Sequence, residues 1–251
     1  MKSHERDTKK ISAMREGGHK LSKIREELAH YTAVGMHFSD IEAEAQRLIR
    51  SSEAVPNFSL VPGYHWATCI MKNDEMCHGI PSQEKIVHDG DLVTIDVGLL
   101  YQGYNLDTTT TFIVGTKTPQ LEEFLAVGKK ALAKAIEKAK VGNSVFDISF
   151  AMQKIVERHG YNMVYQLTGH GIDTELHADP QIPCIAQRSD KRVMLYDGQT
   201  LAIEVMYTQG DSELVVAKDG WTYSTKDHSL SGMIEETVLV TPQGPEILTS
   251  I

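Results

Sequence analysis

The chain has 251 residues, of which 41% are hydrophobic and 24% are charged, and its formal net charge is −9. A chain of this length and composition forms one large domain or two small ones around a substantial core. The acidic balance argues against a general nucleic-acid or anionic-membrane binder, since both need a basic surface.

The three cysteines, Cys69, Cys77 and Cys184, are odd in number and form no C-x-x-C motif. They indicate neither a disulfide framework nor a structural zinc site, so we predict a reducing, cytoplasmic setting. No uninterrupted apolar run reaches transmembrane length, and the polar N-terminus does not resemble a signal peptide. We expect residues 1–10 to be a flexible N-terminal segment and residues 11–251 to be a single domain.

Two helices are predicted before the first strands. Residues 9–32 are rich in charge and carry apolar residues at helical spacing. Ser39 and Glu42 form a capping-box pattern, which predicts a second helix that runs to about Ser51.

The stretch "LVTIDVGLLYQGYNLDTTTTF" (92–112) predicts two strands joined by a turn between Tyr101 and Tyr104. Its apolar and β-branched flanks each carry a carboxylate, Asp96 and Asp107. Because the two positions share the expected midpoint of the turn, we predict that they lie directly opposite each other, about 5 Å apart at Cβ. Either one is protonated or cations lie between them. The alternative is that both cap the turn and face solvent.

Two more helices are predicted after these strands. Thr118 followed by Pro119 is typical of a helix start, and apolar residues continue at helical spacing to residue 139. Ser144 is the expected cap of the next helix, which ends near residue 160. Phe150 belongs to the apolar face predicted for that helix.

The sequence contains an internal repeat. "DGDLVTIDV" (89–97) and "DGQTLAIEV" (197–205) align without a gap, which places Glu204 at the position of Asp96. "LDTTTTFIVG" (106–115) and "IEETVLVTPQG" (234–244) likewise place Glu235 at the position of Asp107. We infer two duplicated halves, about 11–116 and 117–251. Each is two helices followed by strands, so we predict an α/β (α+β) fold with one mixed or antiparallel sheet and helices on its outer face.

If a pseudo-two-fold axis relates the halves, the four carboxylates converge in one cleft. Such a cluster needs positive charge, and two divalent cations would balance it. Oxygen ligands suit Mn²⁺, Fe²⁺ or Co²⁺, and a nearby imidazole extends the choice to Zn²⁺.

Histidines that could supply this imidazole lie in "LTGHGIDTELHADP" (167–180). The stretch holds His170 and His177, and Gly169 and Gly171 allow a close backbone approach. A lone histidine is more often structural than a ligand, but beside four acids we expect one of the two to bind metal. "CHGIP" (77–81) adds His78 on a loop.

These residues match a known family. Over residues 10–250 the chain resembles the type I methionine aminopeptidases, which have the pita-bread fold shared with prolidases and aminopeptidase P. The resemblance is carried by "CHGIP", "IDVGLLYQGYNLDTT", "TGHGIDTELHADPQIP", "LAIEV", "KDGWTYSTKDHSLS" and "IEETVLVT". It implies two pseudo-two-fold-related halves that form a curved, mainly antiparallel sheet in a single catalytic domain.

The resemblance also implies a role for each site residue. The implied ligands of two divalent ions (Co, Mn, Fe or Zn) are Asp96, Asp107, His170, Glu204 and Glu235. The implied catalytic residues are His78, His177 and Glu204, and the implied substrate-binding residues are Tyr64, Cys69, His78, His177 and Trp221. Two alternatives stay open, a packing role for Trp221 and ligation by Glu236. Neighbours on a strand face opposite sides, so only one of Glu235 and Glu236 can point inward.

The implied activity is removal of the N-terminal methionine from nascent proteins and peptides, by attack of a hydroxide held between two metal ions. The implied setting is a monomer in the cytoplasm with transient ribosome association and no direct contact with nucleic acid or membrane. One rival is an Xaa-Pro aminopeptidase or prolidase-like peptidase, which has the same ligands, although "CHGIP" and "DGWTYSTKD" favour the methionine enzyme. Another is a non-catalytic binding module.

The chain departs from the family pattern mainly around the side-chain pocket. Residues that differ from the usual ones are Phe58, Val61, His65, Ala67, Asp173, Leu176, Ala178 and Val205. These departures leave the implied ligands intact and bear on the preference for methionine.

Overall fold

The computed structural model describes residues 2–250, with side chains described from Thr8 onward. The helices are α1 (Lys2–Tyr31), α2 (Phe38–Ser51), α3 (Pro119–Ile136), α4 (Val145–Arg158) and the short 3₁₀ segments η1 (Phe58–Leu60) and η2 (Arg188–Arg192). The large sheet comprises β1 (Thr68–Lys72), β3 (Leu92–Tyr101), β4 (Tyr104–Ile113), β5 (Asn162–Met163), β6 (Thr168–Gly171), β7 (Ala178–Pro183), β8 (Thr200–Thr208), β11 (Ser231–Thr241) and β12 (Gly244–Ile247). A small sheet comprises β2 (Glu75–Cys77), β9 (Leu214–Val216) and β10 (Tyr223–Thr225).

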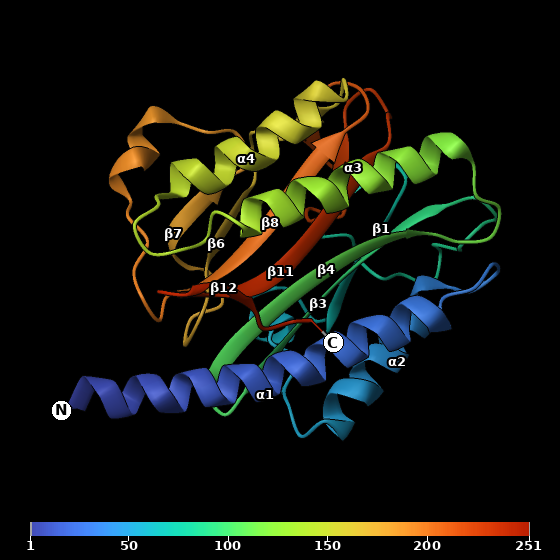
Figure 1. Ribbon diagram of the computed structural model, residues 1–251. Coiled ribbons are helices and arrows are strands. Elements are labelled where there is room, and N and C mark those ends of the chain that lie inside the picture. The colour runs from blue at the N-terminus through green and yellow to red at the C-terminus, as the bar shows by residue number, and fades with distance from the viewer. Residues whose placement is uncertain (1, 251) are drawn as a thin grey trace.

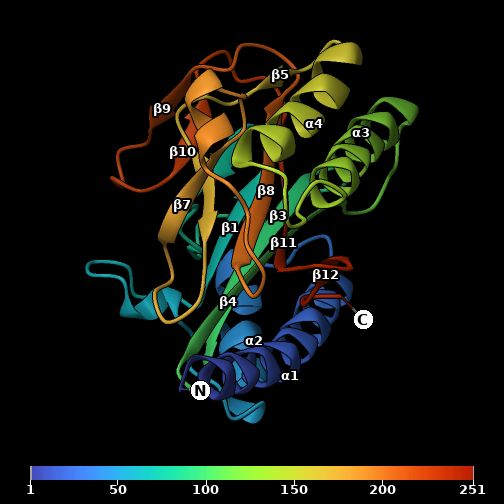
Figure 2. The ribbon, with the colours of Figure 1, turned by 60° about the vertical axis from the view of Figure 1, so that its left-hand side comes forward.

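The large sheet runs in the order β1-β3-β4-β11-β8-β6-β7, and these neighbours pair in antiparallel fashion. Helix α1 packs against β3 and β4, with α2 beside it and against β1, and helix α3 packs against β8 and β11, with α4 beside it and against β5 and β7 (Figures 1 and 2). Each pair of helices buries its own apolar cluster against its strands. The predicted mixed α/β fold with a mainly antiparallel sheet is confirmed.

Helix α1 lies unusually close to the sheet and to the C-terminal segment. Met14, Leu21 and Leu28 recur every seventh residue and are fully buried. Gly18 permits the close approach, because a Cβ there would lie 2.2 Å from the Leu248 carbonyl oxygen. The helix begins at Lys2 and so includes most of the segment that we expected to be flexible; its mobility stays a prediction.

The capping box predicted for α2 is wrong. His37 is the N-cap, and its backbone N–H donates to the Asp40 carboxylate at 3.2 Å. Glu42 instead accepts bonds from the backbone N–H groups of Ala67 at 2.7 Å and Thr68 at 3.0 Å. A tertiary contact with the start of β1 takes the carboxylate that the local pattern assigns to the cap. The helix ends at Ser51, as predicted.

The other two helices begin where the sequence predicts. Thr118 caps α3, Pro119 is its first residue, and Ser144 caps α4. The prediction that Phe150 lies on the apolar face of α4 is wrong. Its side chain is 49% exposed and stacks on Phe146 at the surface, with the ring centroids 5.6 Å apart. Among residues 2–250, no helix combines the length and apolar character needed to cross a membrane.

The turn between β3 and β4 lies between Tyr101 and Tyr104, as predicted, but its midpoint is one residue beyond the midpoint of Asp96 and Asp107. It consists of Gln102 and Gly103, both with positive φ, 50° and 88°. The register consequently pairs Asp96 with Thr109 rather than with Asp107. The prediction that the two aspartates are directly opposed is wrong, and they lie diagonally across the pair on the same face.

Candidate metal centre

Five neighbouring strands each contribute one polar side chain to a single cavity. In sheet order these are β3, β4, β11, β8 and β6. The side chains are those of Asp96, Asp107, Glu235, Glu204 and His170, in the same order. All five residues are at most 8% exposed, and the cavity that they line has a volume of about 280 Å³. The five residues that the sequence singled out as ligands are therefore brought together.

The centre of this group is compact. Ligand atoms of Asp107, His170 and Glu235 all lie within 4.8 Å of one another. Glu204 is directly opposite Glu235 in the β8–β11 ladder. The Nδ1 of His170 lies 2.9 Å from the Gly171 carbonyl oxygen. Since a carbonyl only accepts, this Nδ1 carries the proton, which leaves Nε2 as the free lone pair that a metal ligand needs.

Burial raises the pKa values of the four acids in the cavity. Desolvation, opposed by a hydrogen bond from Thr109, raises the pKa of Asp96 to about 7. Desolvation and the charge of Asp96 raise the pKa of Glu235 to about 8. The pKa values of Asp107 and Glu204 are raised by burial and then by the charge of Glu235. Four acids that repel one another inside the protein are a site for cations.

Burial also shifts the pKa of the His170 imidazole. Burial lowers the pKa of His170 to about 4, so the ring is neutral near pH 7 and able to donate its lone pair. Asp107 Oδ1 is buried and has no hydrogen-bond partner within the described part of the chain. An acceptor without a donor, beside three further carboxylates and a neutral imidazole, fits a divalent ion.

Thr109 is a member of the site that the sequence reading missed. Its Oγ1 lies 3.0 Å from Asp96 Oδ1 and 2.8 Å from Glu235 Oε2, so it orients two of the acids. The available signal was the run of four threonines directly after Asp107. Further residues that line the cavity and were not predicted are Gln166, Leu167, Thr168, Met206 and Met233.

An apolar wall lies beside the acids. Tyr64 and Trp221 meet edge to face with centroids 5.1 Å apart, and Cys69 is paired with Asp96 in the β1–β3 register. Leu176 packs against the same cluster. All three predicted pocket residues thus line the cavity that holds the acids.

His78 and His177 also line the cavity. The His78 ring lies 6.5 Å from that of Trp221, and the His177 ring lies 4.7 Å from that of His170. Burial lowers the pKa of both His78 and His177, so both favour the neutral form. His78 has φ 54°, a conformation that a non-glycine residue adopts at a cost and that is concentrated at functional sites.

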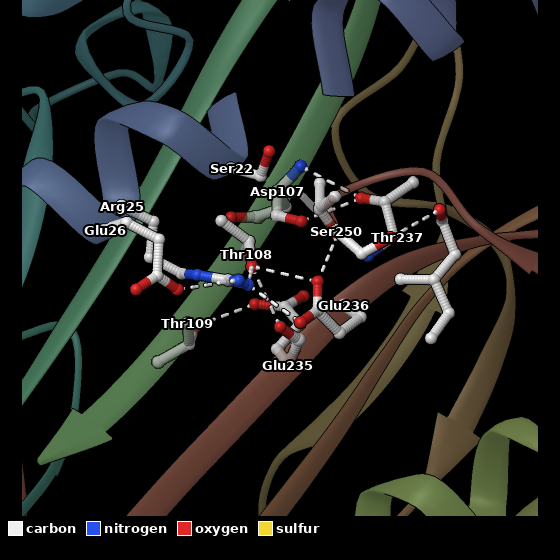
Figure 3. Close-up of polar contacts among 12 residues, drawn as sticks. Ser22, Arg25, Glu26, Asp107, Thr108, Thr109, Glu235, Glu236, Thr237 and Ser250 are labelled. Carbon is white, nitrogen blue, oxygen red and sulfur yellow. Dashed lines mark hydrogen bonds and ion pairs between the residues drawn. The ribbon is translucent and has the colours of Figure 1, made fainter. Parts of the chain in front are cut away.

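Glu236 is placed differently from Glu235. Glu235 lines the cavity, whereas the Glu236 carboxylate pairs with Arg25 of α1 at 2.8 Å (Figure 3). Strand alternation puts the two side chains on opposite faces of β11.

An antiparallel sheet covered by two pairs of helices, with a buried cluster of four acids and one histidine, is an arrangement suited to a metal-dependent enzyme. The chain belongs to metallopeptidase family M24, whose sequence model matches residues 12–242. It is 37% identical to the methionine aminopeptidase of Aquifex aeolicus, over 92% of this chain and 94% of that protein. Identity to the methionine aminopeptidase of Escherichia coli is 35%, over 95% of this chain and 90% of that protein.

Solved structures agree. The crystal structure of methionine aminopeptidase from Thermotoga maritima has a TM-score of 0.94 at 37% identity, covering 97% of both chains. Prolidase from Pyrococcus furiosus has a TM-score of 0.78 at 23% identity and is covered over 64% of its length, which shows a shared fold. The resemblance and the pita-bread fold predicted from sequence are confirmed, and membership of a metallopeptidase family implies an enzyme that uses divalent metal.

Proposed function

We propose that this enzyme is a methionine aminopeptidase, which removes the N-terminal methionine from peptides and nascent chains. The observation that carries the proposal is the line of five buried acid and histidine side chains, one from each of five adjacent strands, beside an apolar wall of the same cavity. Relatives that carry this name match the chain over nearly its full length.

The proposed ligand assignment follows the order of the strands. Asp107 and Glu235 lie on the neighbouring strands β4 and β11 and would help to hold both ions. Asp96 lies on one side and would bind one ion, while Glu204 and His170 lie on the other side and would bind the second. Four carboxylates and one imidazole suit Co²⁺, Mn²⁺, Fe²⁺ or Zn²⁺.

Bound ions would polarise the scissile carbonyl and activate water for its hydrolysis. In the proposed reaction, the Glu204 carboxylate accepts the proton released by the attacking water and passes it to the leaving amine. His177 donates a hydrogen bond to the oxyanion that develops on the carbonyl. Its lowered pKa is consistent with a neutral N–H donor rather than a cation.

Substrate selection would follow from the apolar side of the cavity. Tyr64, Cys69 and Trp221 form an apolar wall against which an unbranched thioether side chain can pack. His78, in its strained conformation at the rim of this wall, would hold the substrate backbone. Leu176 and Phe58 complete the lining and bear most directly on how strictly methionine is preferred.

The rival assignment is an Xaa-Pro peptidase, and a test of substrates distinguishes the two activities. Purified protein should cleave Met-Ala-Ser and leave Xaa-Pro peptides intact when supplied with Mn²⁺, Co²⁺, Fe²⁺ or Zn²⁺. A chelator should abolish turnover, and calorimetric titration should give two ions per chain. Glu204→Gln should be inactive, whereas the control Glu213→Gln, which alters a surface ion pair with Lys226, should be fully active. Cleavage of Xaa-Pro peptides alone would transfer the assignment to the rival.

The proposal extends to the setting of the reaction. The enzyme would act as a cytoplasmic monomer that meets nascent chains through transient ribosome association, without direct binding to nucleic acid or membrane. Light scattering after size-exclusion chromatography tests whether the protein is a monomer. Co-sedimentation with ribosomes tests the association, and its absence would restrict the proposed substrates to released chains.

A further inference from the structure

The seam between β4 and β11 joins the two halves of the sheet and carries two of the proposed ligands. Within residues 2–250, the backbone register of this pair consists of Glu235 with Thr109 alone. By contrast, β8 and β11 form a continuous ladder over Ser231–Leu239. The backbone therefore contributes little to the spacing of Asp107 and Glu235.

Threonine hydroxyls replace the missing ladder. Thr108 Oγ1 donates to the Glu235 carbonyl oxygen at 2.9 Å. Thr237 Oγ1 donates to the Asp107 carbonyl oxygen at 2.7 Å and lies 3.1 Å from the Asp107 backbone nitrogen, which donates to it. All three bonds involve the backbone of a proposed ligand. The distance across the seam thus depends on side chains.

Arg25 holds this seam from the outer face of the sheet. Its Nη1 donates to Thr108 Oγ1 at 2.7 Å and to Glu236 Oε1 at 2.8 Å (Figure 3). Thr108 and Glu236 directly follow Asp107 and Glu235 in the chain, so they lie on the opposite face at the same level of the sheet. One guanidinium therefore contacts both strands immediately behind the proposed ligands.

A single hydroxyl, that of Thr108, connects Arg25 to the backbone of Glu235. The Thr108 hydroxyl accepts from Arg25 and uses its one proton to donate to the Glu235 carbonyl. Thr249 donates a short bond to the other oxygen of Glu236, so that carboxylate is held from both sides. The guanidinium presents donors in a rigid plane, which fixes geometry better than a flexible ammonium does.

Stability alone does not account for such a pair. The Arg25 and Glu236 side chains are 10% and 16% exposed, so both charges are largely removed from water. A buried ion pair of this kind is often no more stable than apolar residues of the same volume. Residues behind metal ligands, in contrast, commonly orient those ligands and affect metal affinity.

We propose that Arg25 is a positioning residue of the metal centre, which sets the spacing of Asp107 and Glu235 by holding Thr108 and Glu236 together across the seam. This inference rests on the ligand set of the proposed function. It assigns a role in metal binding to helix α1, whose side chains from Thr8 onward line no part of the cavity.

The test compares two arginines of the same helix. Arg25→Met removes the contact at the seam. The control Arg15→Met removes an ion pair at 2.7 Å to Glu246 of β12, whose partner in β11 is Leu239 rather than a proposed ligand. Metal-free protein is titrated with Co²⁺ alone in a calorimeter, and the visible absorption of bound Co²⁺ is recorded. We expect Arg25→Met to weaken Co²⁺ binding about 10–100-fold and to change the spectrum. Arg15→Met should bind Co²⁺ as the wild type does.

A double variant separates positioning from stability. Arg25→Met alone leaves the buried Glu236 carboxylate without a cationic partner and should lower the melting temperature. Arg25→Met with Glu236→Leu makes the site apolar and should recover the melting temperature while Co²⁺ binding stays weak. Recovery of affinity together with stability would overturn the positioning role, as would unchanged binding in Arg25→Met. Failure of the wild-type chain to bind Co²⁺ would instead overturn the ligand set and the proposed function.

Discussion

Removal of metal should make the stability of the folded chain fall as the pH rises. Burial raises the pKa of Asp96 to about 7 and that of Glu235 to about 8. Unfolded carboxyls titrate near pH 4, so between about pH 4 and pH 8 these two carboxyls bind more protons in the folded chain than in the unfolded chain. Stability falls with rising pH wherever the folded state binds more protons. The pH window is therefore set by these two shifts.

The expected loss of stability with rising pH is large. Each pH unit between the unfolded and folded pKa values of one carboxyl is worth about 1.4 kcal/mol. Asp96 alone then contributes a loss of about 4 kcal/mol by pH 7. Since the whole free energy of unfolding of a domain is about 5–15 kcal/mol, the metal-free chain should be markedly unstable at about pH 8.

Urea unfolding of chelator-treated protein, followed by tryptophan fluorescence at several pH values between about 5 and 8, measures this slope. Mn²⁺ should flatten it, because a cation pairs with the ionised carboxylates. Asp96→Asn should flatten the metal-free slope in part, since it removes one of the titrating groups. A metal-free stability that stays level or rises over this range would refute the reasoning.

Three further predictions concern single side chains. His177→Ala should lower kcat about 10²–10³-fold with a much smaller change in KM, because it removes a donor to the oxyanion; steady-state kinetics on Met-Ala-Ser measures this. Thr109→Val removes the hydroxyl shared by Asp96 and Glu235 and should weaken Co²⁺ binding about 10-fold, as measured by calorimetry. Glu42→Ala leaves two backbone N–H groups at the start of β1 without their acceptor, which should cost about 3 kcal/mol in urea unfolding.

Each of these has an outcome that contradicts it. Equal losses in Glu42→Ala and in Glu27→Ala, an exposed position of α1, would show that the contact with β1 contributes nothing specific. Unchanged Co²⁺ affinity in Thr109→Val would mean that the shared hydroxyl does not orient the acids. A rise in KM without a change in kcat for His177→Ala would assign that histidine to substrate binding instead.

Sequence patterns predicted most local features of the fold correctly. The caps at Thr118 and Ser144 are confirmed, because a cap is a contact between residues three positions apart. The cap of α2 was predicted wrongly for the opposite reason: Glu42 bonds residues of β1, and no local pattern reports such a partner. The aspartate register was predicted wrongly because a shift of the hairpin midpoint by one residue changes every pair in the hairpin.

The same distinction between local and tertiary information applies to the proposed metal site. The sequence by itself determined which residues could bind metal, since Asp96, Asp107 and their repeats Glu204 and Glu235 interrupt apolar strands where a lone carboxylate is too costly. Only the tertiary structure decided how they converge. The seam between β4 and β11, the hydroxyl of Thr109 between two acids and the reach of Arg25 from α1 all join residues far apart in the chain. Their spacing depends on how the two halves pack, and side-chain periodicity carries no information about that distance.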